Sequence, residues 1–143
     1  NWDELLECEM IPFKRGISKG AKLIMTAHVS VPEVTFSELP STLSRVMLTE
    51  KLRGELGFEG VIVTDAIEMG AITKQFSVEE AAVMAVQAGA DLITLPNDFK
   101  AAIAAIEAAV QAGDITTQRI DESVARILDL KRSILESRGL LIK

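Results

Sequence analysis

The sequence predicts an α/β fold in which about three parallel strands alternate with helices. Three short apolar runs rich in β-branched residues lie near 23–27, 61–65 and 92–95. They are nearly continuous rather than alternating, which is typical of strands buried on both faces by helices. Their starts are about 38 and 31 residues apart, enough for a strand, a crossover helix and two loops. Aromatic residues make up only 4% of the 143 residues, and the predicted core is therefore aliphatic.

Five helices are predicted around these strands, and each has a physical start signal. Pro12 suits the first turn of the first helix, which runs to Ser18 just before the first strand. The other four begin at side chains that can cap a helix N-terminus: Ser44, Ser77, Asp98, and Thr116 or Thr117. Three of them are followed by a glycine that can adopt the positive φ of a helix stop: Gly57, Gly89 and Gly113.

Three strands are too few for a closed eight-stranded barrel, which typically takes about 250 residues. A small open sheet and a partial TIM-type (β/α)8 barrel are both compatible with the pattern. In either case the apolar outer strands would expose unpaired backbone groups. We therefore expect the isolated chain to self-associate or to pair with a missing N-terminal half.

The composition restricts the partners. A net charge of −6 argues against nucleic acid and anionic membrane surfaces, because both require a basic patch. No run reaches the roughly 18 apolar residues of a membrane segment. Cys8 is the only cysteine and His28 the only histidine, so we expect no internal disulfide and no metal site. The compartment stays open, because a targeting signal could precede these residues.

Candidate functional residues directly follow the predicted strands. Asp65 ends the second strand, and His28 occupies the equivalent place after the first. Carboxyl ends of parallel strands share one edge, where ligands bind, so both side chains could face one pocket. Met69, in the loop after Asp65, could line that pocket or pack beneath it, and Glu68 is expected to be exposed. On position alone, a turn-capping Asp65 and a structural His28 are the commoner roles.

Four strings in the chain resemble the N-terminal barrel domain of glycoside hydrolase family 3. They are KLIMTAHV at 22–29, ELGFEGVIVTDAIEMGAI at 55–72, AGADL at 88–92 and RIDESVARIL at 119–128. Their order and spacing cover almost the whole chain. The resemblance implies that residues 1–143 form the C-terminal half of a TIM-type barrel, with strands one to five absent.

The same resemblance implies a role for Asp65. The family pattern Gly-Phe-x-Gly-x-x-x-[Ser/Thr]-Asp, whose aspartate is the nucleophile of a retaining β-glycosidase, reads here from Gly57 to Asp65. Ala27-His28, together with Met69 four residues after Asp65, is similar to the β-N-acetylhexosaminidase branch. That branch implies a glycan containing N-acetylglucosamine as substrate, a pocket lined by His28 with Met69 near the sugar, and no metal or organic cofactor.

The family's acid/base pair, an Asp-His on an earlier loop, has no counterpart in the sequence. We therefore expect the chain alone not to hydrolyse glycosides at a useful rate. Three alternatives remain open: a β-glucosidase or β-xylosidase of the same family, a non-catalytic half-barrel that self-associates with a structural Asp65, and an unrelated open-sheet α/β domain.

Overall fold

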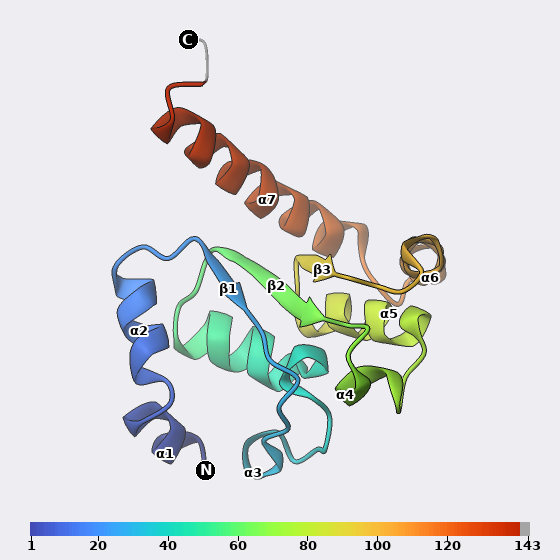
Figure 1. The fold of residues 1–143 in the computed structure, drawn as a ribbon, viewed down its shortest axis with the longest axis horizontal. Helices are drawn as coiled ribbons and strands as arrows, with labels where there is room; N and C mark the ends of the chain where they lie inside the picture. The colour runs from blue at the N-terminus through green and yellow to red at the C-terminus, as the bar shows by residue number, and fades with distance from the viewer. Residues whose placement is uncertain (141–143) are drawn as a thin grey trace.

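The computed structural model describes residues 1–140 and contains one parallel three-stranded sheet in the order β1-β2-β3 (Figure 1). The strands are β1 (Leu23–Met25), β2 (Val61–Ala66) and β3 (Leu92–Thr94). Leu23 pairs with Val61, and Val63 pairs with Leu92. All three predicted strands and their parallel pairing are confirmed, and their bounds lie within two residues of the prediction.

Helices precede, connect and follow the strands. The five longer ones are α2 (Ile11–Ser18), η2 (Val46–Glu55), α5 (Val78–Ala88), α6 (Phe99–Ala112) and α7 (Thr117–Ser137). Four short ones were not predicted: α1 (Trp2–Glu7), α3 (Pro32–Thr35), η1 (Ser41–Leu43) and α4 (Gly70–Thr73). In Figure 1, η2 and α5 lie on one side of the sheet and α7 on the other. Within residues 1–140, no helix has the length and apolar character needed to cross a bilayer.

Three of the four helices that were predicted to begin at a capping side chain do so. Ser77 and Glu80 form a reciprocal capping box, with hydrogen bonds of 3.2 and 2.9 Å. Asp98 Oδ1 accepts from two backbone amides of α6, each at 3.0 Å. Of the two threonines proposed for α7, Thr116 is the cap, since its hydroxyl accepts from the Arg119 amide at 3.1 Å. The Ser44 hydroxyl accepts a long 3.4 Å bond from the Met47 amide, and η2 begins two residues later, at Val46.

The main core lies between the sheet and the pair η2 and α5. Ile62 of the central strand is fully buried there among side chains that include Leu48, Phe58 and Ala85. The prediction that all strands are buried on both faces is wrong for β1, where Leu23 is 44% and Met25 58% exposed. Since β1 is an edge strand, only its Ile24 packs against the helix layer.

A buried carboxylate joins the amino ends of the strands to the helices. The Asp91 side chain is 0% exposed. Its Oδ2 accepts from Arg53 Nη2 at 2.6 Å and from the Ile62 amide at 2.9 Å. Its Oδ1 accepts from Ser123 Oγ at 2.6 Å and from Arg126 Nη1 at 3.1 Å. One carboxylate therefore ties η2, β2 and α7 to the start of β3.

Arg119 is the third arginine of this cluster. Its Nη1 lies 3.6 Å from Asp91 Oδ1, and its Nη2 donates to the Ala90 carbonyl at 2.7 Å. Burial lowers the pKa values of Arg53 and Arg119, and the Asp91 charge opposes that shift. Three guanidinium groups thus share one anionic partner, and Asp91 is the only carboxylate that all of them contact among the described residues.

Removal of the Asp91 charge is expected to destabilise the fold strongly. Asp91→Asn leaves three partly buried arginines without their shared counter-charge, and loss of one partner of a buried ion pair typically costs about 3–5 kcal/mol. Urea unfolding followed by circular dichroism measures the loss. Asp129→Asn is the matched control, because Asp129 forms only an exposed 3.4 Å pair with Arg132. Equal unfolding midpoints for the two variants would contradict the prediction.

A second, exposed contact attaches α1 to η2. The Trp2 indole Nε1 donates to Glu55 Oε2 at 2.6 Å. Lys51 pairs with the same carboxylate and lies 4.9 Å from the Trp2 ring centroid. The hydrogen bonds from Lys51 and Trp2 lower the pKa of Glu55 from its ordinary 4.5. A lowered folded-state pKa means that this contact stabilises the fold above about pH 4.5 and is lost as the pH falls through the lower value.

Trp2 is the only tryptophan, so its fluorescence reports this contact directly. We expect a change in its emission on acidification, with a midpoint below 4.5. Glu55→Gln should remove that transition, whereas Glu50→Gln, an exposed carboxyl on the same helix, should leave it in place. A transition that persists unchanged in Glu55→Gln would show that Trp2 responds to a different group.

Candidate functional site

The three site residues predicted from the sequence lie at the carboxyl ends of β1 and β2. Asp65 is the penultimate residue of β2, and Met69 precedes α4 with 45% of its side chain exposed. His28 follows β1, and its Nε2 lies 2.9 Å from the Ala66 carbonyl oxygen. The Met69 amide donates to the same oxygen at 3.1 Å. Both His28 and Met69 therefore contact the residue that follows Asp65.

Asp65 carries a half-buried carboxylate with spare acceptor capacity. Its Oδ1 accepts from the Ala66 amide at 2.7 Å. Within residues 1–140 this is the single hydrogen bond to the carboxylate, and no cation pairs with it. Asp91 has both oxygens occupied, and Asp98 is a helix cap. Asp65 thus differs from these two structural aspartates, and a carboxylate with a free oxygen can act as a nucleophile or a base.

Thr64 anchors β2 to β3 immediately before the carboxylate. The Thr94 amide donates to Thr64 Oγ1 at 3.0 Å, and the Thr94 hydroxyl donates to the Thr64 carbonyl at 2.9 Å. The register of the two strands then shifts between Val63 and Ala66. Irregularities of this kind re-aim a side chain at the end of a strand. The threonine of the Thr-Asp pair therefore has a structural part in the site.

The glycines of the 57–65 string act through the backbone rather than through chemistry. Gly57 ends η2 with a φ of 66°. A Cβ at Gly60 would lie 2.5 Å from the Lys22 carbonyl oxygen, so only glycine lets the chain before β2 approach the chain before β1 this closely. Phe58, between them, is buried in the core. These residues set where β2 begins, and so where its Asp65 end falls.

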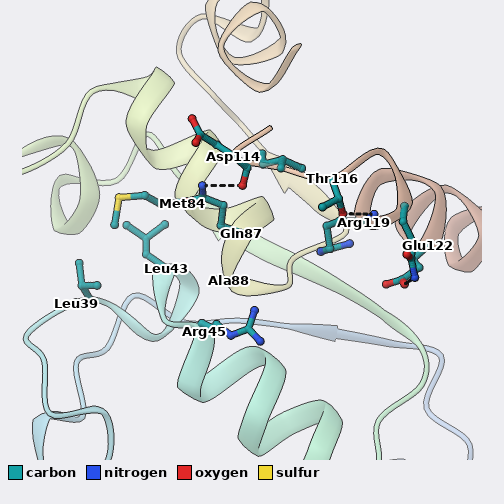
Figure 2. Close-up of a pocket in the computed structure, with 12 residues that line it drawn as sticks. Leu39, Leu43, Arg45, Met84, Gln87, Ala88, Asp114, Thr116, Arg119 and Glu122 are labelled. Carbon is teal, nitrogen blue, oxygen red and sulfur yellow. Dashed lines mark hydrogen bonds between the residues drawn. The ribbon is translucent and has the colours of Figure 1, made fainter. Parts of the chain in front are cut away.

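Two cavities lie apart from Asp65. One, of about 720 Å³, is lined by residues of η1, α5 and α7 and of the loop before α7, among them Leu43, Gln87 and Arg119. The Gln87 Nε2 donates to the Asp114 carbonyl at 3.4 Å, and a dashed line joins these two lining residues in Figure 2. A second, of about 450 Å³, is mainly apolar and borders β1. Neither cavity is lined by Asp65.

Two residues at this end of the sheet, Thr42 and Leu95, were not predicted as part of the site. Thr42, fully buried, places its hydroxyl 2.9 Å from His28 Nδ1 and 2.7 Å from the Thr26 hydroxyl. Leu95, just after β3, has a φ of 45° with 62% of its side chain exposed. A leucine in the left-handed region is strained, and such residues cluster at functional sites. No local sequence signal marks Thr42, and Leu95 was predicted as the last residue of the third strand, which ends one residue earlier, at Thr94.

A free carboxylate at the carboxyl end of an inner parallel strand, followed by a helix, is the layout of a barrel-type α/β enzyme. Comparison with known proteins agrees. The sequence profile of the glycosyl hydrolase family 3 N terminal domain matches residues 1–130, and the chain belongs to this family. Its solved relatives have the TIM-type barrel fold that the sequence predicts. Among the described residues, no group of three or more His, Cys, Asp or Glu could hold a metal ion.

Relatives with hexosaminidase names cover most of the chain. It is 28% identical to "Beta-hexosaminidase A" of Pseudoalteromonas piscicida over 97% of its own length and 27% of that protein. A β-N-acetylglucosaminidase structure from Paenibacillus sp. str. FPU-7 superposes with a TM-score of 0.88 at 48% identity, covering 91% of this chain and 25% of that one. The β-glucoside phosphorylase BglX superposes at 0.87 and 30% identity, with coverage of 95% and 26%. The chain thus spans about a quarter of these relatives.

Proposed function

We propose that Asp65 is the catalytic nucleophile of a retaining β-N-acetylhexosaminidase that removes terminal β-linked N-acetylglucosamine. The observation that carries the proposal is the Asp65 carboxylate itself, half-buried at the end of the central strand, with one hydrogen bond and no cation among the described residues. Family membership supports the reaction class, because retaining glycosidases use a carboxylate in this role. Residues 1–143 would supply the C-terminal half of the barrel.

The hexosaminidase assignment draws on two further observations. Names of this type dominate the relatives, although one, from Cellulomonas fimi, is a "Beta-N-acetylglucosaminidase/beta-glucosidase". The residue after Asp65 is Ala66, where the β-glucosidases of the family usually have tryptophan. Met69, exposed four residues beyond Asp65, and His28 would line the wall of the sugar pocket. A β-glucosidase or β-xylosidase remains the second candidate, supported by the BglX superposition.

The proposed reaction has two steps. The Asp65 carboxylate attacks the anomeric carbon as the glycosidic oxygen leaves, through an oxocarbenium-like transition state, and a glycosyl ester forms. Water then attacks the same carbon, the ester bond breaks, and the sugar is released with its β configuration retained. The acid that protonates the leaving oxygen, and then accepts the proton of the water, would come from outside these 143 residues. The chemistry needs no metal.

A chimera tests the nucleophile. Residues 1–130 would replace the aligned segment of the Paenibacillus enzyme, which supplies the other strands, and turnover of a nitrophenyl N-acetyl-β-glucosaminide would be measured. Loss of a nucleophile is expected to lower kcat by at least about a thousandfold in Asp65→Gly. Azide should restore release of nitrophenolate and give the α-glycosyl azide, because it attacks from the face that Asp65 vacates.

Three comparisons accompany this experiment. Glu68→Gln, at the exposed carboxylate three residues further on, should retain full activity. Faster turnover of the glucoside than of the N-acetylglucosaminide would favour the second candidate.

The 143-residue chain alone should show no turnover, because it lacks the acid. Turnover by that chain that disappears in Asp65→Asn would show that it carries its own acid. If the chimera with Asp65→Gly kept full activity, Asp65 would not be the nucleophile, and a self-associating, non-catalytic half-barrel would explain the chain better.

A further inference from the structure

His28 connects the ends of two neighbouring strands through both nitrogens of its ring. It lies three residues beyond β1 and is half-buried. Its Nδ1 is 2.9 Å from Thr42 Oγ1, and its Nε2 is 2.9 Å from the carbonyl oxygen of Ala66, the last residue of β2. To bond a ring nitrogen, a sugar hydroxyl would first have to displace one of these two partners.

The contact between His28 and Ala66 lies beyond the end of the regular hydrogen bonding between β1 and β2. The pairing of β1 with β2 runs from Leu23 to Met25 and closes with the Thr26 amide, which donates to the Val63 carbonyl at 2.9 Å. On the other side of β2, the register with β3 shifts between Val63 and Ala66. Asp65 sits inside that irregular stretch. The His28 side chain thus contacts the last residue of β2 beyond the point where the β1 ladder ends.

Ala66 transmits this contact to the carboxylate. Its carbonyl accepts from His28 and from the Met69 amide, and its own amide donates to Asp65 Oδ1 at 2.7 Å. When the Ala66 carbonyl is held by these two donors, rotation about the backbone bonds of Ala66 is restricted. The direction of the Ala66 amide, which donates to the Asp65 carboxylate, is then restricted too. The Ile67 amide, which donates to the Thr94 carbonyl at 3.2 Å, completes the support on the β3 side.

The hydrogen-bond partners also define where the protons lie. The Ala66 carbonyl can only accept, so Nε2 carries a proton. In the neutral ring Nδ1 is then a bare acceptor, and the Thr42 hydroxyl donates to it. Thr42 in turn accepts from the Thr26 hydroxyl at 2.7 Å, and both threonines are buried. The Ala66 carbonyl therefore sets the tautomer of the neutral ring, and the two buried threonines hold the ring in one orientation.

We infer that His28 is a positioning residue, which with Thr42 fixes the Ala66 peptide and through it the Asp65 carboxylate. The inference rests on the proposed role of Asp65 as the nucleophile. A nucleophile must be held close to its attack geometry, since small displacements of a reacting group are costly. Because the contact acts on the protein backbone, its effect is present without substrate and without the rest of the barrel.

Nuclear magnetic resonance on the 143-residue chain tests the inference through two variants of His28. The amide nitrogen of His28→Gln reaches about as far as Nε2 and can still donate to Ala66, whereas His28→Asn reaches only the Thr42 side. In His28→Asn, loss of one hydrogen bond should speed exchange of the Ala66 amide up to about tenfold and move the Asp65 carboxyl carbon resonance. His28→Gln should restore both, and the Ile62 amide, in the regular part of β2, should be unaffected in either variant.

The unsubstituted chain gives an independent readout, which holds even where a variant folds poorly. Ring nitrogen shifts of the neutral His28 ring should show its proton on Nε2 and a bare Nδ1. The opposite tautomer would overturn the inference, as would unchanged Ala66 and Asp65 signals in His28→Asn, or equal changes in the two variants. None of these readouts involves catalysis. A negative result in these measurements would therefore not contradict the proposal that Asp65 is the nucleophile. Conversely, evidence that Asp65 is not the nucleophile would not contradict the contact between His28 and Ala66.

Discussion

The Asp91 carboxylate organises the amino ends of the strands, and the rest of the sheet depends on it. It is fully buried and draws one arginine from η2, two from α7 and one backbone amide from β2 to the start of β3. A buried charge is tolerated only when its partners are in place, so these segments have to assemble together. Ile93 of β3 packs against two hydrophobic clusters, one of which includes residues of η2 and α5 and the other residues of α5 and α6.

The buried carboxylate at the amino end of the sheet and the carboxylate at its carboxyl end differ in how many hydrogen-bond donors they have. At the amino end Asp91 has both oxygens occupied by donors. At the carboxyl end Asp65 receives, within residues 1–140, a single bond, from its neighbour Ala66. The saturated carboxylate stabilises the fold, and the unsaturated one keeps the capacity to react. Barrel enzymes in general separate stability and chemistry between the two ends of their strands in this way. The Thr64–Thr94 pair marks the boundary, because the regular register ends beside it.

Local signals predicted the strands, the helix caps and the position of Asp65, because apolar runs, capping side chains and strand ends act over a few residues. The Asp91 cluster escaped prediction since its partners come from positions 53, 119, 123 and 126, which the chain joins only after folding. The role of His28 depends likewise on Thr42 and Ala66, at separations of 14 and 38 residues. The exposure of Met25 could not be predicted from its own run, because it depends on what lies beside β1.

Any segment that covers this end of the sheet would meet both the exposed apolar residues of β1 and the Asp65 carboxylate with its free oxygen. Covering Leu23 and Met25 would stabilise the assembly, since both are apolar and about half exposed. Covering Asp65 would cost free energy unless new donors replaced the water at its free oxygen. A purely apolar partner therefore fits β1 but not the site. A covering segment that is apolar beside Leu23 and Met25 and carries polar groups at the height of Asp65 would satisfy both conditions.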